Sequence, residues 1–217
     1  MFLRNGVRKK RFSIYIMPLN ITNSLTIGKY AKKTVTDISW VAVGQGSIAN
    51  STDGNSWNEA VTKGGFTTGW GVAYGTDGAG NGRWVAVGNG SLIAYSSNGK
   101  TWTGSATKGG IGTFGYGVAY GTDGAGNPRW VAVGVGSLIA YSPNGNNWTA
   151  AASKGGISNT AYGVAYGKDG AGIGRWVAVG EGGLIAYSPN GNDWTAAATK
   201  GGITTKAYGV AFKNEIV

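Results

Sequence analysis

The chain alternates short apolar runs with turns rich in glycine and asparagine, and this alternation recurs along most of its length. In one copy the runs are AYGVAYG at 161–167, RWVAVG at 175–180 and LIAYS at 184–188, with a fourth run starting at Trp194. Such runs, bounded by turn residues, predict β-strands, and the Asn-Gly pair at 190–191 predicts a hairpin turn. Each copy therefore predicts four antiparallel strands joined by three short turns.

The copies are marked by the pentapeptide WVAVG, which begins at Trp40, Trp84, Trp130 and Trp176, about 45 residues apart. The chain has 217 residues, of which 42 are Gly and nine are Trp. A period of this length with this composition is typical of a β-propeller, in which each repeat forms one small sheet, or blade. We therefore expect an all-β fold with a single propeller of four blades, each of four antiparallel strands.

The repeats are permuted relative to these blades. The last copy ends on a lone first strand at 207–212, whereas the first copy begins on a second strand at 40–44. Pairing 208–212 beside 40–44 would close the ring and remove two exposed sheet edges. A five-bladed propeller is the alternative, if segments 11–16 and 24–30 supply further strands.

The positive charge of the chain lies mostly outside the repeats. The net charge is +10, and residues 1–33 hold eight of the 19 Lys and Arg residues without any acid. We therefore divide the chain into a basic N-terminal arm at 1–33 and a nearly neutral propeller at 34–217. We expect the arm to tether the protein to an acidic surface or, without specificity, to nucleic acid. Its basic residues include Arg8, Lys9, Lys10, Arg11, Lys29, Lys32 and Lys33.

The N-terminal region also bears on location. No stretch approaches the length of a membrane-spanning helix. The apolar segment 12–19 is short and lacks a small-residue cleavage site, so it does not make a convincing signal peptide. Met17 is an alternative start, which would place residues 1–16 outside the native protein.

Each copy also carries the element Ser-x-Asn/Asp-Gly-x-x-Trp, at 51–57, 96–102, 142–148 and 188–194. This element resembles the Asp-box of the bacterial neuraminidase repeat but is one residue shorter, and three copies have Asn in place of Asp. The shortened form is similar to repeats of phage, large-virus and bacterial surface proteins. The resemblance covers about residues 40–212 and implies a propeller in which the box holds a hairpin and its Trp packs between sheets.

The residue types argue against an enzyme. The chain has no His and no Cys, which removes the commonest general base and the thiolate ligands of metals. Arg83, Arg129 and Arg175 occupy one repeat position, so we expect each to pair across its own turn with Asp77, Asp123 or Asp169 rather than to converge as in a sialidase. The glycine-rich turn at 76–83 lies between two strands and lacks the helix that a phosphate loop needs. We expect no catalytic residue, no metal and no cofactor.

Two sets of positions vary between the copies. One is the residue after WVAVG, and the other is the loop between blades, such as 158–160 and 204–206. The loops also carry a repeated Lys, followed by an aromatic residue at the start of the next strand. These pairs suit sugars or acidic surfaces, although core packing of the aromatic residues is an equal alternative. The candidate contact residues are Lys63, Lys108, Lys154, Lys200, Trp70, Tyr116, Tyr162 and Tyr208.

These observations favour a non-enzymatic protein that acts through contacts with other structural proteins or acidic surfaces. The resemblance implies a structural or attachment component of a virion, a virus-like particle or a cell surface. The alternative from a different class is a multivalent, lectin-like propeller that binds carbohydrate through the loops between blades.

Overall fold

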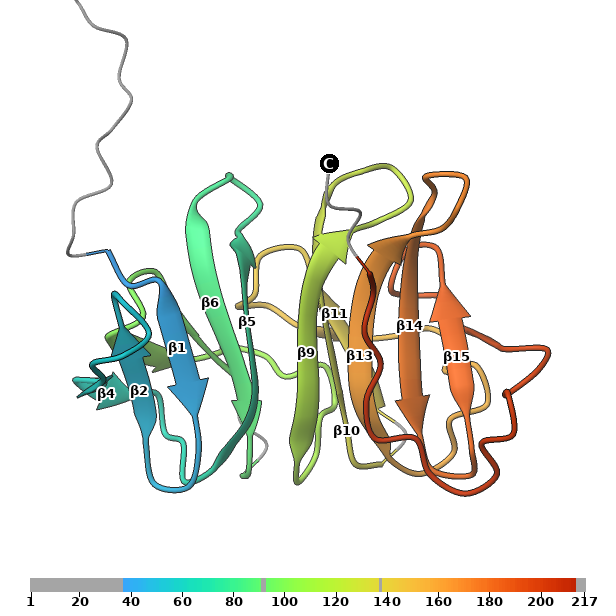
Figure 1. The fold of residues 1–217 in the computed structure, drawn as a ribbon, viewed down its shortest axis with the longest axis horizontal. Coiled ribbons are helices and arrows are strands. Elements are labelled where there is room, and N and C mark those ends of the chain that lie inside the picture. The colour runs from blue at the N-terminus through green and yellow to red at the C-terminus, as the bar shows by residue number, and fades with distance from the viewer. Residues whose placement is uncertain (1–36, 91–92, 137, 214–217) are drawn as a thin grey trace, which may run out of the picture. The chain divides into compact units, whose positions relative to one another are not determined.

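The computed structural model describes residues 37–90, 93–136 and 138–213, all within the compact unit Val35–Val217. The predicted basic arm and the candidate extra strands at 11–16 and 24–30 lie outside these residues, so the arm and the five-bladed alternative stay predictions. The described chain is all-β and forms four sheets of three to five strands (Figure 1). In this part of the chain, no helix is long and apolar enough to cross a membrane.

The four sheets follow the four repeats in chain order. The first sheet contains β1 (Trp40–Val43), β2 (Ile48–Ser51) and β3 (Asn58–Glu59). The second contains β5 (Gly69–Thr76), β6 (Gly82–Gly88), β7 (Ile93–Ser96) and β8 (Thr101–Gly104), with β4 (Thr62–Lys63) paired in parallel to β8. The third contains β9 (Gly115–Thr122), β10 (Pro128–Gly134), β11 (Leu138–Ser142) and β12 (Thr149–Ala150). The fourth contains β13 (Ala161–Lys168), β14 (Gly174–Gly180), β15 (Ile185–Ser188) and β16 (Thr195–Ala196).

The second strand of a repeat is apolar along both faces because it is covered on both sides. In β10 the side chains from Trp130 to Val133 are 0% exposed. Successive residues of a strand point to opposite faces, so this continuous burial means that a sheet packs against each face. The prediction made from the WVAVG segment is confirmed for this strand.

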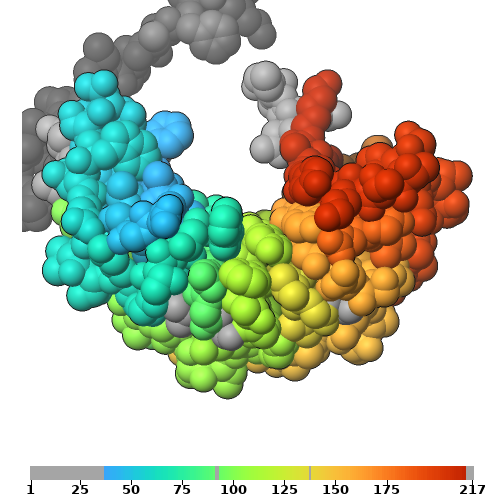
Figure 2. All heavy atoms as spheres, turned by 90° about the horizontal axis from the view of Figure 1, so that it is seen from below, coloured from blue at the N-terminus to red at the C-terminus, as the bar shows by residue number. Residues whose placement is uncertain are grey.

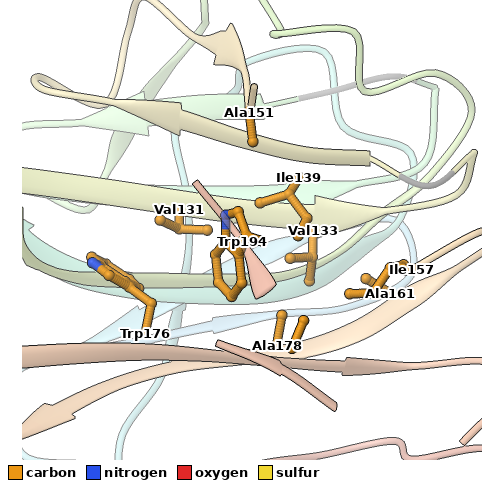
Figure 3. Close-up of a cluster of buried hydrophobic side chains, with 10 residues drawn as sticks. Val131, Val133, Ile139, Ala151, Ile157, Ala161, Trp176, Ala178 and Trp194 are labelled. Carbon is orange, nitrogen blue, oxygen red and sulfur yellow. The ribbon is translucent and has the colours of Figure 1, made fainter. Parts of the chain in front are cut away.

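Three clusters of buried side chains join consecutive sheets. In the cluster between the third and fourth sheets, Val131, Val133 and Ile139 face Trp176 and Ala178 (Figure 3). The indole Nε1 of Trp176 donates to the carbonyl oxygen of Thr122 in the preceding sheet, at 2.9 Å. Trp130 makes the equivalent bond to Thr76, so the core of the protein lies between the sheets and these two tryptophans each link a pair of them.

The first strands of the second, third and fourth sheets, which we call the inner strands, approach one another closely. β5 lies next to β9, and β9 lies next to β13. The Cβ of any larger residue at Gly121 of β9 would come within 2.2 Å of the Tyr166 ring of β13. Glycine at this position therefore makes room for the aromatic ring of the next inner strand.

The predicted pairing of 208–212 with 40–44 is not formed. Among the described residues, strand β1 pairs with β2 but not with the C-terminal segment, which we define as 207–213 and which forms no strand. This segment lies beside β13, where the Phe212 ring covers Gly167. The first sheet and the C-terminal segment occupy the two ends of an arc (Figure 2). The sheet-to-sheet contacts repeated along the chain set an orientation that leaves these two ends apart.

Candidate functional site

The polar residues of the Ser-x-Asn-Gly-x-x-Trp element are engaged in holding their own turn. The Ser142 hydroxyl accepts hydrogen bonds from the backbone N–H groups of Asn144 and Gly145, at 3.2 and 2.8 Å. The Trp148 indole donates to the Gly145 carbonyl oxygen at 3.1 Å and is only 3% exposed. These groups act locally on the hairpin, as the resemblance implies.

The repeated arginines pair with the repeated aspartates, as predicted. The distances between the Arg nitrogen and the Asp oxygen are 3.5 Å for Arg83–Asp77, 3.2 Å for Arg129–Asp123 and 3.2 Å for Arg175–Asp169. The N–H of Ile173 and the Arg175 guanidinium hold the pKa of Asp169 below its ordinary value. Arg83 also donates to the carbonyl oxygen of Asn144 in the next repeat. Because each arginine is held by the aspartate of its own repeat, the three do not converge on one funnel.

The aromatic residues at the start of the inner strands occupy β-bulges. Against β6, strand β5 pairs Gly69 with Gly88 and Gly71 with Val87, which leaves Trp70 as the extra residue. The same register shift leaves Tyr116 unpaired in β9 and Tyr162 unpaired in β13. A bulge turns its extra side chain away from the regular alternation of the strand and is frequent next to binding sites.

These bulge residues and Tyr208 form one continuous aromatic row across the inner strands. The ring centroids are 6.0 Å apart for Trp70–Tyr116, 5.4 Å for Tyr116–Tyr162 and 5.2 Å for Tyr162–Tyr208. Trp70 and Tyr208 are 53% and 69% exposed, and the two rings between them are partly exposed. We call Trp70, Tyr116, Tyr162 and Tyr208 the aromatic row. Of the two alternatives, core packing and surface contact, its exposure favours surface contact.

The two variable sets of positions meet beside this row. Isolated β-bridges join the residue after each WVAVG to the following inter-sheet loop, as Gln45–Thr68, Asn89–Phe114, Val135–Thr160 and Glu181–Lys206. In the fourth repeat the Glu181 carboxylate accepts a hydrogen bond from the Tyr162 hydroxyl at 2.9 Å. It also lies 3.2 Å from the Lys206 ammonium. One end of the aromatic row therefore carries a carboxylate and an ammonium group held in place by each other.

The pKa values of this cluster shift in the directions that its contacts require. The Tyr162 hydroxyl, followed by the Lys206 ammonium, lowers the pKa of Glu181 below its ordinary value of 4.5. Hydrogen bonding to Glu181 raises the pKa of Lys206 above 10.5 and that of Tyr162 above 10.0. The charged forms of Glu181 and Lys206 are thus favoured over a wide range of neutral pH.

We expect the Glu181→Gln substitution to remove one component of the acid sensitivity of the protein. Because the folded-state pKa of Glu181 lies below its unfolded value, its stabilising effect is full above pH 4.5 and is lost as the pH falls through the folded value. The free energies of unfolding of the wild type and the variant should therefore converge on acidification. Urea unfolding of both proteins at a series of pH values measures this difference, and a difference that stays constant below pH 4.5 contradicts the expectation.

The repeated lysines do not pair with the aromatic row in the manner that the sequence suggests. Lys63 forms an ion pair with Glu59 at 2.7 Å and donates to the Gly46 carbonyl oxygen. Among the described residues, the cation–π pairs join Arg83 to Tyr95, Arg129 to Tyr141 and Arg175 to Tyr187, and none involves a lysine. For Lys63, Lys108, Lys154 and Lys200 a role in binding stays a prediction.

Lys206 and Glu181 are functional candidates that the sequence did not single out as site residues. Both stand at positions that vary between repeats, and this variation was the available signal. The sequence did not predict their pairing, because the two residues lie 25 positions apart and meet through an isolated β-bridge between a turn and a loop.

Comparison with known proteins finds solved structures that are similar to this chain at low sequence identity. No family model matches the chain, and no curated protein matches it. A fucose lectin from Kordia zhangzhouensis, solved in complex with methyl-fucoside, is 14% identical with a TM-score of 0.43, over 59% of this chain and 98% of the lectin. The computationally designed Ika8 protein is 9% identical with a TM-score of 0.49, over 82% of this chain and 53% of the design.

A GH74 enzyme from Niastella koreensis is also similar, with 20% identity and a TM-score of 0.43 over 75% of this chain. The match spans 24% of the enzyme, so this chain corresponds to about a quarter of that protein. At these identities and TM-scores, none of the three structures assigns a function to this chain.

Proposed function

We propose that this protein is a non-catalytic binding protein whose aromatic row holds a carbohydrate chain. The observation that supports this function is the placement of three of the four rings on β-bulges. The repeated scaffold thereby turns Trp70, Tyr116 and Tyr162 out of the strand ladder and lines them up beside Tyr208. Trp70 and Tyr208 are exposed and the two rings between them are partly exposed, and such accessible apolar surface is typical of an interaction site.

The chemistry of the row suits a sugar. A pyranose ring has an apolar C–H face that covers an aromatic ring, and hydroxyl groups at its edge that need donors and acceptors. The aromatic row supplies the apolar surface, whereas Glu181 and Lys206 supply an acceptor and a donor beside Tyr162. Neighbouring rings lie 5.2 to 6.0 Å apart, so they form one extended surface rather than separate pockets. The ligand that fits is therefore an oligosaccharide chain laid across several rings.

The role in a virion or at a cell surface, which was predicted from the sequence, remains a proposal. Attachment to a glycosylated surface is one way in which a carbohydrate-binding repeat protein serves such a role, since several weak contacts on one scaffold add up to avidity. The repeated Arg–Asp pairs support the non-catalytic part of the proposal. Each carboxylate is held by backbone N–H groups and a guanidinium within its own turn.

We expect replacement of Tyr116 and Tyr162 by alanine to abolish most of the carbohydrate binding. A loss of about tenfold in affinity per ring corresponds to about 1.4 kcal/mol. A glycan array identifies the ligand for the wild type, and calorimetry with that glycan compares the variants. The matched control is Tyr74→Ala, because Tyr74 is 56% exposed but stands outside the aromatic row, against Trp84.

Two outcomes contradict this function. If the wild-type protein binds no glycan on a broad array, carbohydrate binding is rejected. If it binds a glycan but the Tyr116→Ala/Tyr162→Ala protein binds equally well, the aromatic row is not the site.

A further inference from the structure

The first sheet exposes tryptophan side chains whose equivalents in the third and fourth sheets are buried. Trp40 is 56% exposed, whereas at the same repeat position Trp84 is partly buried and Trp130 and Trp176 are 0% exposed. Trp57 is 44% exposed, whereas its equivalents Trp102, Trp148 and Trp194 are 3%, 3% and 4% exposed. One face of the first sheet therefore has the composition of an interface but no partner sheet within the described residues.

The fourth sheet has a face that no turn of a following sheet covers among the described residues. A cleft of about 210 Å³ lies on the face of the fourth sheet that is turned away from the third sheet. The residues that line it include Arg175, Val177 and Phe212. In the second and third sheets, the positions of Arg175 and Val177 are covered by a turn of the next sheet. Gly145 packs against Arg83 and Val85, and Gly191 packs against Arg129 and Val131. The equivalent turn for the fourth sheet is the one at 51–54 in the first sheet, where the described neighbour of Gly54 is Trp40 of its own sheet.

In the part of the chain that the structure describes, the first sheet lacks an inner strand equivalent to β5, β9 and β13. The sequence of such a strand is present in the C-terminal segment. The inner strand β5 pairs with β6 through Gly71–Val87, Val72–Ala86, Ala73–Val85 and Tyr74–Trp84. Applied to the sequence GVAF of the C-terminal segment, this register pairs Gly209 with Val43, Val210 with Ala42, Ala211 with Val41 and Phe212 with Trp40. Phe212 would then lie on Trp40 as Tyr74 lies on Trp84, where the ring centroids are 4.7 Å apart.

The hydrogen bonds that join consecutive repeats agree with this match. Trp130 and Trp176 donate to the carbonyl oxygens of Thr76 and Thr122, so the repeat assigns Trp40 to the carbonyl of Lys168. The Thr62 hydroxyl bridges the backbone of Trp102, and that of Thr107 bridges the backbone of Trp148. Continuing this series pairs Thr199 with the backbone of Trp57. Strand, turn and hydrogen bonds thus specify the same interface.

We propose that the two ends bind the ends of a second copy of this chain, so that two copies close one ring of eight sheets. Three interfaces of this kind join the four sheets of one chain, yet the first sheet and the C-terminal segment lie at opposite ends of the arc. The rotation between successive sheets is therefore less than the quarter turn that would close four sheets on themselves. A head-to-tail interface generates a closed ring when the rotations between successive sheets add up to a full turn over a whole number of copies. Two copies form the smallest such ring.

The proposal is tested by blocking each end separately in the full-length chain. Trp40→Lys places a charge in the predicted interface of the first sheet, and Val177→Lys places one in the cleft of the fourth sheet. Light scattering and native mass spectrometry should show a dimer for the wild type and a monomer for each variant alone. An equimolar mixture of the two variants should recover a dimer, because one intact pair of ends remains. Trp70→Lys is the control, since Trp70 is equally exposed but lies on neither end.

Several results overturn the inference. A monomeric wild type rejects it. A dimer that survives both substitutions shows that another surface joins the copies. Failure of the mixed variants to associate, when circular dichroism shows both to be folded, rejects the head-to-tail arrangement. None of these outcomes depends on whether the aromatic row binds a glycan.

Discussion

Replacement of Trp130 by alanine is expected to lower the free energy of unfolding by about 3–5 kcal/mol. The side chain is 0% exposed and belongs to the cluster between the second and third sheets. Its indole Nε1 donates to the Thr76 carbonyl oxygen at 3.0 Å, and its ring lies 4.9 Å from that of Tyr120. The substitution therefore leaves a cavity, removes a hydrogen bond between two sheets and leaves a partly buried carbonyl without its partner.

Chemical denaturation followed by circular dichroism measures this change, at one fixed protein concentration because assembly shifts apparent stability. The matched control is Trp70→Ala, which removes the same side chain from a position that is 53% exposed. We expect the control to change the free energy of unfolding by less than about 1 kcal/mol, since surface substitutions have small effects. Equal losses for the two variants would show that the core does not lie between the sheets.

The second large effect is expected at Gly121, whose replacement by alanine should destabilise the protein by about 1–3 kcal/mol. The added Cβ would lie 2.2 Å from the Tyr166 ring, which cannot yield freely because its hydroxyl is hydrogen-bonded to Thr122. The backbone of Gly121 has no positive φ, so the expected loss comes from the lack of space and not from a strained conformation.

The control for this prediction is Gly170→Ala in a turn of the fourth repeat, where an added Cβ meets no atom within 4 Å. Its effect on the free energy of unfolding should stay within about 0.5 kcal/mol. Thermal or urea unfolding of the two variants provides the comparison. If Gly121→Ala proves as stable as Gly170→Ala, the inner strands do not approach as closely as the structure shows.

Together the two expected results locate the stability of this protein between its sheets. Each sheet alone is small, and the buried Trp, Val and Ile side chains become inaccessible only where two sheets meet. The ends of the series are the exception, because there the same side chains remain exposed. This contrast is what connects the packing of the repeats to the proposed assembly of two copies.

The strands and the turns were predictable from the amino-acid sequence because local chemistry controls them. The predicted strands 175–180 and 184–188 correspond to Gly174–Gly180 and Ile185–Ser188 in the structure. The Asn-Gly turn places Gly191 at a φ of 77°, a conformation that glycine adopts without a Cβ clash. The Arg175–Asp169 pair was equally predictable, since its partners are six residues apart and face each other across one turn.

The aromatic row, the Glu181–Lys206 pair and the open ends of the arc followed from contacts between distant segments. A bulge arises when two strands pair out of step, so the outward turn of Tyr162 depends on the register of β13 against β14. The orientation of one sheet on the next depends on how side chains such as Val131 and Trp176 fit together across the interface. A repeat motif specifies which residues enter that interface, but the angle at which they meet is a property of the packed sheets, and this angle leaves Trp40 and Phe212 apart.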